Sequence, residues 1–349
     1  MTAVAMIESH LAEARRARAE DDLGTARHAL AEAVACADRL GDPSWISITR
    51  WRSAKAAFDA ADPAGALTAV EPLLQLEDPF ADYAGGLKAV EPMTRLAWDQ
   101  LGYADRRPER LWQAWTAHHR RIGDPFLAAM GEVHAAWPLA CRGELDALSA
   151  LLERWAAVTP RRFGSGPHRH AEAPDTPASV FWIQRDVART VLRGATWTGA
   201  DRLAWLAWEA LEDAMEDTGG DRTADYWFLE PVARAGLRFG WEDALSYLPP
   251  WEEAAARLEH PRADLHRALT AGELSRHRGD PDTAREHFLA AVLAVGDSGP
   301  EWLADALREA ARCGATTLPD LDEVIHRRGL HAFTREGPET SGSLPDMED

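Results

Sequence analysis

Cysteine is scarce in this chain, and long apolar stretches are absent. The 349 residues include three cysteines, Cys36, Cys141 and Cys313, which lie far apart and form no CxxC pair. An odd, dispersed set argues against a disulfide framework and favours reduced thiols that pack as small apolar residues. No run of about 18 apolar residues could span a membrane, and the N-terminal segment lacks the apolar core of a signal peptide. We therefore expect a cytoplasmic protein.

Positive charge is also in short supply. Lys and Arg number 38 against 57 Asp and Glu, which gives a formal net charge of -19 and a pI near 5.1. This balance argues against a nonspecific grip on nucleic acid or on an anionic membrane. We expect neither as a direct partner, and any basic surface must be local.

Familiar catalytic motifs are missing as well. The chain has no GxxxxGK[ST] P-loop, no GxGxxG, no HExxH and no nucleophile elbow. His168 and His170, with Glu172 nearby, could hold a metal only if two more ligands came from elsewhere. Carboxylate–histidine pairs at helical spacing occur at Glu323 with His326 and at Glu273 with His277. Solvated surface explains each of these better, so we expect no metal, no cofactor and no catalytic residue.

Tryptophan, by contrast, is abundant. The chain has 15, and several fall three residues apart, such as Trp112 with Trp115 and Trp205 with Trp208. Residues at this spacing lie on one face of a helix. Packing between helices is the favoured interpretation of these pairs, and a platform on which a ligand stacks is the alternative.

One segment near the C-terminus predicts two helices joined by a very short turn. Gly279 can close a helix, and Asp280 with Pro281 suits the start of the next one. Apolar residues then follow at five, nine and twelve positions after the glycine, which is one helical face. The same pattern recurs along the chain, with first apolar anchors at Ala26, Ala66, Leu111, Leu148, Ala204, Leu245 and Ala284. An all-α chain of about seven antiparallel helical hairpins fits these anchors.

The last hairpin resembles a tetratricopeptide repeat. The resemblance rests on Gly272, Ala284, Phe288 and Ala291 around the Gly279 turn, although the spacing is nearer 40 residues than 34. It implies a right-handed superhelical α-solenoid. The turns ending in GDP at residues 41–43 and 123–125 resemble the degenerate repeats in the helical arms of large bacterial signalling ATPases and transcription regulators. No ATPase or DNA-binding module accompanies them here.

Composition divides the chain into four parts. Helical hairpins are expected over 1–158 and again, with a capping helix, over 179–331. Between them, residues 159–178 are rich in proline, glycine, arginine and histidine and should form a loop. Residues 332–349 are acidic and almost devoid of large apolar side chains, so a disordered tail is expected there.

The resemblance also predicts which residues would line a binding groove. In a tetratricopeptide-like array the first helix of each hairpin lines the concave face. Stepping back from the anchors by helical spacings gives Arg15, Arg18, Trp51, Lys55, Tyr103, Trp137, Arg189, Arg193, Trp227, Arg234 and Arg276. Cations exceed acids among these inner positions, and loop residues Arg161, Arg162 and Arg169 could add to them. The combination suits a protein or peptide with acidic or carboxylate groups.

These features favour a non-catalytic scaffold or adaptor. The alternatives are an all-helical enzyme or enzyme subunit with a site under the 159–178 loop, and a ligand-sensing regulatory arm acting on a separate partner. Within the groove, Arg189, Arg193 and Arg234 are expected to converge on an anion of the partner. Replacing Arg189 and Arg193 by Gln should then weaken binding while leaving thermal stability nearly unchanged.

Overall fold

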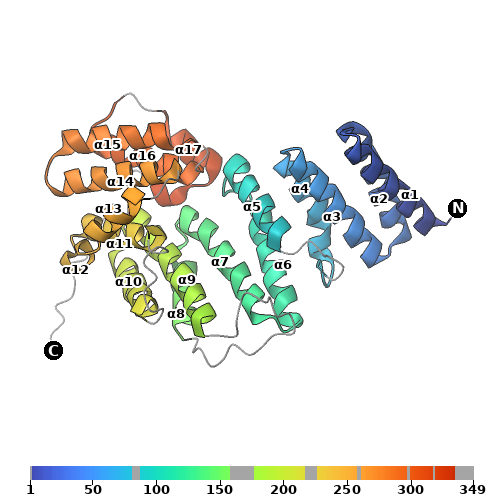
Figure 1. Ribbon diagram of the computed structural model, residues 1–349, viewed down its shortest axis with the longest axis horizontal. Helices are drawn as coiled ribbons and strands as arrows, with labels where there is room; N and C mark the ends of the chain where they lie inside the picture. Colours follow the sequence, from blue (N-terminus) through green and yellow to red (C-terminus); the bar gives the residue numbers. More distant parts are fainter. Residues whose placement is uncertain are drawn as a thin grey trace. The chain divides into compact units, whose positions relative to one another are not determined.

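A computed structural model describes the chain over residues 2–80, 87–157, 177–216, 226–257, 261–296, 299–316 and 319–334. All regular secondary structure in these ranges is helical, and no strand occurs in them, so the predicted all-α class is confirmed (Figure 1). Nor is any helix in these ranges long and apolar enough to cross a membrane.

The helices fall into two compact units, and the boundary lies within α7 at residues 135 and 136. The first unit contains α1 (Ala3–Ala19), α2 (Leu23–Leu40), α3 (Pro43–Asp59), α4 (Pro63–Val70), the 3-10 helix η1 (Glu71–Gln75), α5 (Leu87–Leu101), α6 (Arg107–Arg121) and the start of α7 (Pro125–Arg142). The second contains the end of α7, α8 (Leu145–Ala156), α9 (Pro177–Thr198), α10 (Asp201–Glu216), α11 (Tyr226–Phe239), α12 (Glu242–Leu245), α13 (Leu248–Arg257), α14 (Pro261–His277), α15 (Pro281–Ala294), α16 (Pro300–Arg312), α17 (Leu321–Arg328) and the 3-10 helix η3 (His331–Phe333).

Within the units, consecutive helices pack against each other, as α1 with α2, α3 with α4, α9 with α10 and α14 with α15. The predicted tail begins too early, because Ala332 and Phe333 belong to η3 and are buried. Residues 159–176 of the predicted loop, and the tail from residue 335, lie outside the described residues.

The turns between paired helices share one backbone conformation. Six of the seven positions that precede an anchor by five residues have positive φ: Asp21, Ala61, Gly143, Gly199, Gly240 and Gly279. In each of these turns the next residue donates its N–H to the carbonyl five positions earlier, at 2.8–3.0 Å. The third turn differs, because its left-handed residue is Gly102 and the predicted position, Arg106, caps α6 with φ -88. A local helix-closing motif therefore recurs along the chain.

The anchors after these turns are buried in six hairpins: Ala26, Ala66, Leu111, Leu148, Ala204 and Ala284. In the remaining one the prediction is wrong by one residue, since Ala244 is fully buried and Leu245 is only half-buried. The helix there, α12, has four residues, too few for helical periodicity to fix which side faces inward.

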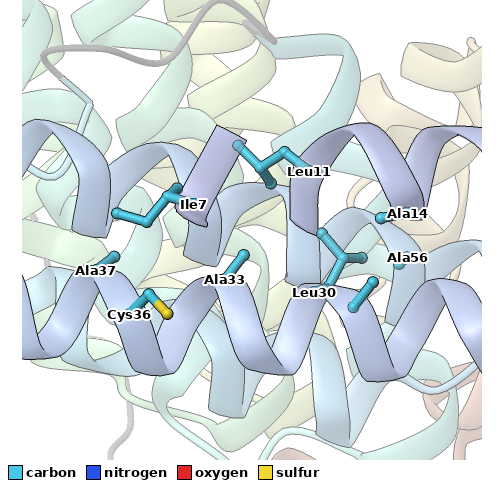
Figure 2. Packing of buried hydrophobic residues seen from close by; sticks show 9 residues of the cluster. Ile7, Leu11, Ala14, Leu30, Ala33, Cys36, Ala37 and Ala56 are labelled. Carbon is cyan, nitrogen blue, oxygen red and sulfur yellow. The ribbon is translucent and has the colours of Figure 1, made fainter. Parts of the chain in front are cut away.

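Small residues let the paired helices approach closely. In the first unit, Ile7 and Leu11 of α1 point toward Leu30 and Ala33 of α2 (Figure 2). Cys36 lies in the same cluster, and all three cysteines are buried, as expected. In the last hairpin the face of Gly272 lies against the Phe288 ring, so near that a Cβ atom on Gly272 would come within 2.6 Å of it.

The turn conformation leads to a prediction about stability. Ala61 has φ 54, a region that costs a residue with a Cβ about 1–2 kcal/mol. Ala61→Gly should therefore raise the free energy of unfolding by roughly 0.5–1 kcal/mol, measured by chemical denaturation.

The matched control is Ala64→Gly, which changes an exposed position inside α4. It should lower the free energy of unfolding by roughly 0.5–1 kcal/mol, because glycine is a poor helix former. Equal losses in both variants would contradict a left-handed residue at position 61.

Candidate functional site

The predicted groove residues fall into both units, and their environments differ sharply. In the first unit, Arg15, Arg18 and Lys55 are exposed, whereas Trp51 and Tyr103 are buried. The Trp51 ring packs at 5.2 Å from Phe80 and donates its Nε1–H to the Pro79 carbonyl at 3.0 Å, while the Tyr103 ring stacks on Trp98. Neither of these two aromatic residues is available to a partner in this structure.

In the second unit the predicted cations lie largely within the protein. Arg193 and Arg234 are buried, whereas Arg189 and Arg276 are half-buried. Trp137 is half-buried as well, and its ring lies 5.6 Å from the Arg193 guanidinium. The side chain of Trp227 and the loop residues Arg161, Arg162 and Arg169 lie outside what the structure describes.

Arg193 and Arg234 belong to a largely buried charge cluster that joins four helices of the second unit. We define the cluster by its four arginines and four acids: Arg193 on α9; Glu230, Arg234 and Arg238 on α11; Glu273 on α14; and Asp305, Arg308 and Glu309 on α16. The formal charges of these eight residues cancel. Their spacings of three and four residues along α11 and α16 place the charges of each helix on one face.

The centre of the cluster is the Glu230 carboxylate, which is fully buried. Arg193 pairs with it from α9 and Arg234 approaches it at 3.5 Å from the next turn of α11. Arg234 Nη2 also lies 2.8 Å from Asp305 Oδ2, so one guanidinium connects α11 to α16. These contacts join residues 37 and 71 positions apart in the sequence.

Glu309 forms a second centre, surrounded by four guanidiniums. Arg308 Nε and Arg312 Nη1 reach it from its own helix at 2.8 and 2.9 Å. Arg238 Nη1 reaches it from α11 at 3.1 Å, and Arg276 pairs with it from α14. Glu309 therefore joins three helices.

Arg308 connects this centre to the backbone. Its guanidinium is 2 % exposed and donates to the Trp197 carbonyl at 2.5 Å and to Asp305 at 2.9 Å. It also lies over the Phe333 ring at 5.2 Å and donates to the Ala332 carbonyl at 3.3 Å, so it contacts the buried segment after α17. A buried guanidinium is stable only when its donors are occupied in this way.

Indole rings cover the Arg193 side of the cluster. Trp302 lies 5.0 Å from the Arg193 guanidinium, and Trp197 packs edge-on against both Trp137 and Trp302. The His266 ring lies 4.5 Å from Trp302 and is fully buried. These rings lower the local polarity, and a buried cation gains from their π faces.

Opposite charges favour the ionised forms of Glu230 and Arg234. Burial alone would raise the pKa of Glu230, but the positive charges of Arg193, His266 and Arg234 outweigh it and lower that pKa to about 2. Burial would likewise lower the pKa of Arg234, and Asp305 and Glu230 instead raise it. Burial and the nearby Glu309 raise the pKa of Glu273.

This arrangement differs from the expectation that Arg189, Arg193 and Arg234 meet a partner's anion. The carboxylates that these arginines contact belong to the same chain. Arg189 pairs with Asp186 at 2.8 Å, and Arg193 and Arg234 share Glu230. For Arg193 the structure therefore favours a loss of stability on substitution, the opposite of the unchanged stability predicted from the sequence.

In both carboxylate–histidine pairs noted in the sequence, the carboxylate forms an ion pair with an arginine. Glu273 pairs with Arg276, and Glu323 pairs with Arg327 on the surface. No group of His, Cys, Asp and Glu in the described ranges has the geometry of a metal site.

The contribution of α16 to the buried charge cluster is not predicted from the sequence. Asp305, Arg308 and Glu309 are three of the eight cluster residues, yet the sequence analysis predicts no role for the segment between the last hairpin and the capping helix. A signal was present, because these charges and Arg312 follow one another at spacings of three, one and three among alanines, the periodicity of one helical face.

The exposed cations of the first unit form a smaller site. We call Arg15, Arg18 and Lys55 the basic edge. Arg18 on α1 and Lys55 on α3 both pair with Asp59, which brings the two helices' exposed faces together. Arg15 lies one turn from Arg18 and has no ion pair among the residues that the structure describes. Among the described residues, two of the three cations thus share one carboxylate as their ion-pair partner.

Comparisons with protein families and with curated proteins find no match to this chain.

The buried charge cluster predicts a large effect from removing one carboxylate. Glu230→Gln leaves Arg193 and Arg234 short of negative charge in the interior, so the free energy of unfolding at pH 7 should fall by about 3–5 kcal/mol. Glu253→Gln, which removes an exposed partner of Arg257, should change it by less than about 1 kcal/mol. Similar values for the two variants would contradict a buried ionised Glu230.

The same residue predicts the response to acid. The pKa of Glu230 is about 2 in the folded protein against a usual value of 4.5. Its contribution to stability is therefore complete above about pH 4.5 and is lost as the pH falls toward 2. The difference in unfolding free energy between the parent and Glu230→Gln should shrink over this range, and a constant difference would show that Glu230 is not held ionised.

Proposed function

We propose that the protein is a non-catalytic binding protein, a scaffold or adaptor, that recognises an acidic or carboxylate-bearing protein segment through the basic edge. The observation that carries the proposal is the charge imbalance at this edge, where the exposed Arg18 and Lys55 share the carboxylate of Asp59 and the exposed Arg15 lies one turn before Arg18. In an otherwise acidic protein, such an imbalance is available to an incoming carboxylate.

The environment of the other predicted cations supports this choice of surface. Arg193 and Arg234 already have carboxylate partners inside the second unit, so a ligand would have to break buried ion pairs to reach them. Arg15, Arg18 and Lys55 are exposed and could bind an anion at little cost. We accordingly assign recognition to α1 and α3.

The same proposal includes the wider architecture. We propose that the hairpins form a tetratricopeptide-like solenoid and that the protein works in the cytoplasm. The recurring left-handed turns and the close contact of Gly272 with Phe288 support the first part. The three dispersed, buried cysteines support the second.

Selection from a random displayed peptide library tests the proposed partner chemistry. Peptides retained by the immobilised parent protein should be enriched in Asp and Glu. Binding of the best peptide should weaken about tenfold in Arg15→Gln/Lys55→Gln, since each of the two lost charge contacts contributes about 0.7 kcal/mol.

The matched control is Arg257→Gln/Arg327→Gln, which removes the same charge from two exposed arginines elsewhere. It should change affinity by less than about twofold, because screening confines surface charges to roughly 8–10 Å. Selected peptides without acidic enrichment, or equal losses in both double variants, would contradict recognition at the basic edge.

A further inference from the structure

A second surface of opposite character lies in the other unit. Trp205 and Trp208 of α10 gather with Phe239 at the end of α11 and Trp241 in the turn that follows, and the exposed Leu206 is next to Trp205 in the sequence. We call these five residues the aromatic patch. Trp205 is 37 % exposed and Leu206 is 45 % exposed. Trp208 is buried, and Phe239 and Trp241 are half-buried. The patch thus has a buried base and an exposed rim.

The rings support one another in a fixed arrangement. Trp208 and Trp241 are stacked at 5.6 Å and 15°, and Phe239 stacks on Trp241 at 4.9 Å. Trp205 stands edge-on to both tryptophans, at 4.8 and 5.2 Å. Because Trp208 is anchored in the core, the exposed Trp205 is held by its neighbours and does not need to be ordered by a ligand.

Core packing explains only part of this cluster. The inward face of α10 carries Ala204, Trp208 and Leu211, all buried. Trp205 and Leu206 lie outside that face, where solvent contacts them. Two adjacent large apolar side chains exposed beside further aromatic rings are typical of an interaction surface.

The charges around the patch indicate what it would bind. Glu209 lies one turn beyond Trp205, and Glu242 and Asp243 directly follow Trp241. All three are exposed, and they outnumber the exposed cation Arg202, which lies one turn before Trp205 on α10. An aromatic surface bordered by carboxylates favours a cation, which gains from both the π faces and the acidic border.

We propose that the aromatic patch is a docking surface for a cationic peptide segment in which Lys or Arg alternates with apolar residues. The apolar side chains would cover Trp205 and Leu206, and the cations would meet Glu209, Glu242 and Asp243. This surface is distinct from the basic edge and selects the opposite charge. A second copy of the chain, or its acidic C-terminal segment, would bring like charge to the same border.

A fluorescein-labelled peptide of alternating lysine and leucine tests the proposal by fluorescence anisotropy with the full chain. Trp205→Gln should weaken binding about tenfold, and Trp205→Phe, which keeps a ring, should weaken it less than about threefold. Leu293→Gln is the control: Leu293 is 87 % exposed on α15 of the same unit, and its loss should leave affinity within about twofold.

A charge variant separates the border from the general acidity of the protein. Glu209→Gln/Glu242→Gln/Asp243→Asn should weaken binding at least about threefold and reduce its salt dependence. Glu253→Gln/Asp282→Asn/Glu323→Gln removes the same charge from exposed positions elsewhere in the unit and should not.

Several results would overturn the proposal. Equal losses in the two charge variants would mean that the peptide senses only net charge, and an unaffected Trp205→Gln would exclude the patch. Concentration-dependent dimers in sedimentation that disappear in Trp205→Gln would assign the patch to self-association, and tighter peptide binding after removal of residues 335–349 would assign it to the tail. None of these outcomes involves Arg15, Arg18 or Lys55, so the two surfaces stand or fall separately.

Discussion

The second unit depends on the ion pairs that surround the buried carboxylate of Glu230. An ionised group in the interior is tolerated only when opposite charges and hydrogen-bond donors surround it. Arg193 from α9 and Arg234 from α11 provide these charges, and Arg234 extends the connection to Asp305 of α16. Because every charge needs its partner, the helices that carry them are held in one relative position within the unit.

This requirement also determines which arginines can bind a ligand. Arginine side chains on one helical face resemble a binding surface when only the sequence is considered, because the acids that neutralise them lie on other helices. In the second unit Arg193, Arg234 and Arg276 already pair with buried carboxylates of the same chain, so a ligand would have to displace those carboxylates. In the part of the first unit that the structure describes, Asp59 is the one carboxylate that pairs with Arg18 and Lys55, and both cations stay exposed. Both sets of cations are predicted from helical spacings in the sequence. They differ in the partners that the tertiary structure brings to them.

How far the sequence predicts the structure depends on the range of the interaction. The helical hairpins and their turns are local, since Asp21, Ala61 and the four glycines at equivalent positions act within a few residues of themselves. Prediction failed by one residue at Leu245, where α12 is too short to carry a periodic signal. The environment of Arg193 could not be predicted, because its partner Glu230 is 37 residues away and on another helix. Whether a Trp faces the core or solvent is likewise tertiary, as Trp205 and Trp208 show from positions one turn apart.

The two proposed surfaces would bind partners of opposite charge. The basic edge lies on α1 and α3, and the aromatic patch lies on α10 and the turn after α11. Binding at either surface requires no buried charge to lose its partner, which is the central claim of this account. Hydrogen–deuterium exchange with a bound acidic peptide tests it directly. The account predicts slower exchange in α1 and α3 and no change in α9, α11 and α14, whereas protection concentrated in α11 and α14 would contradict it.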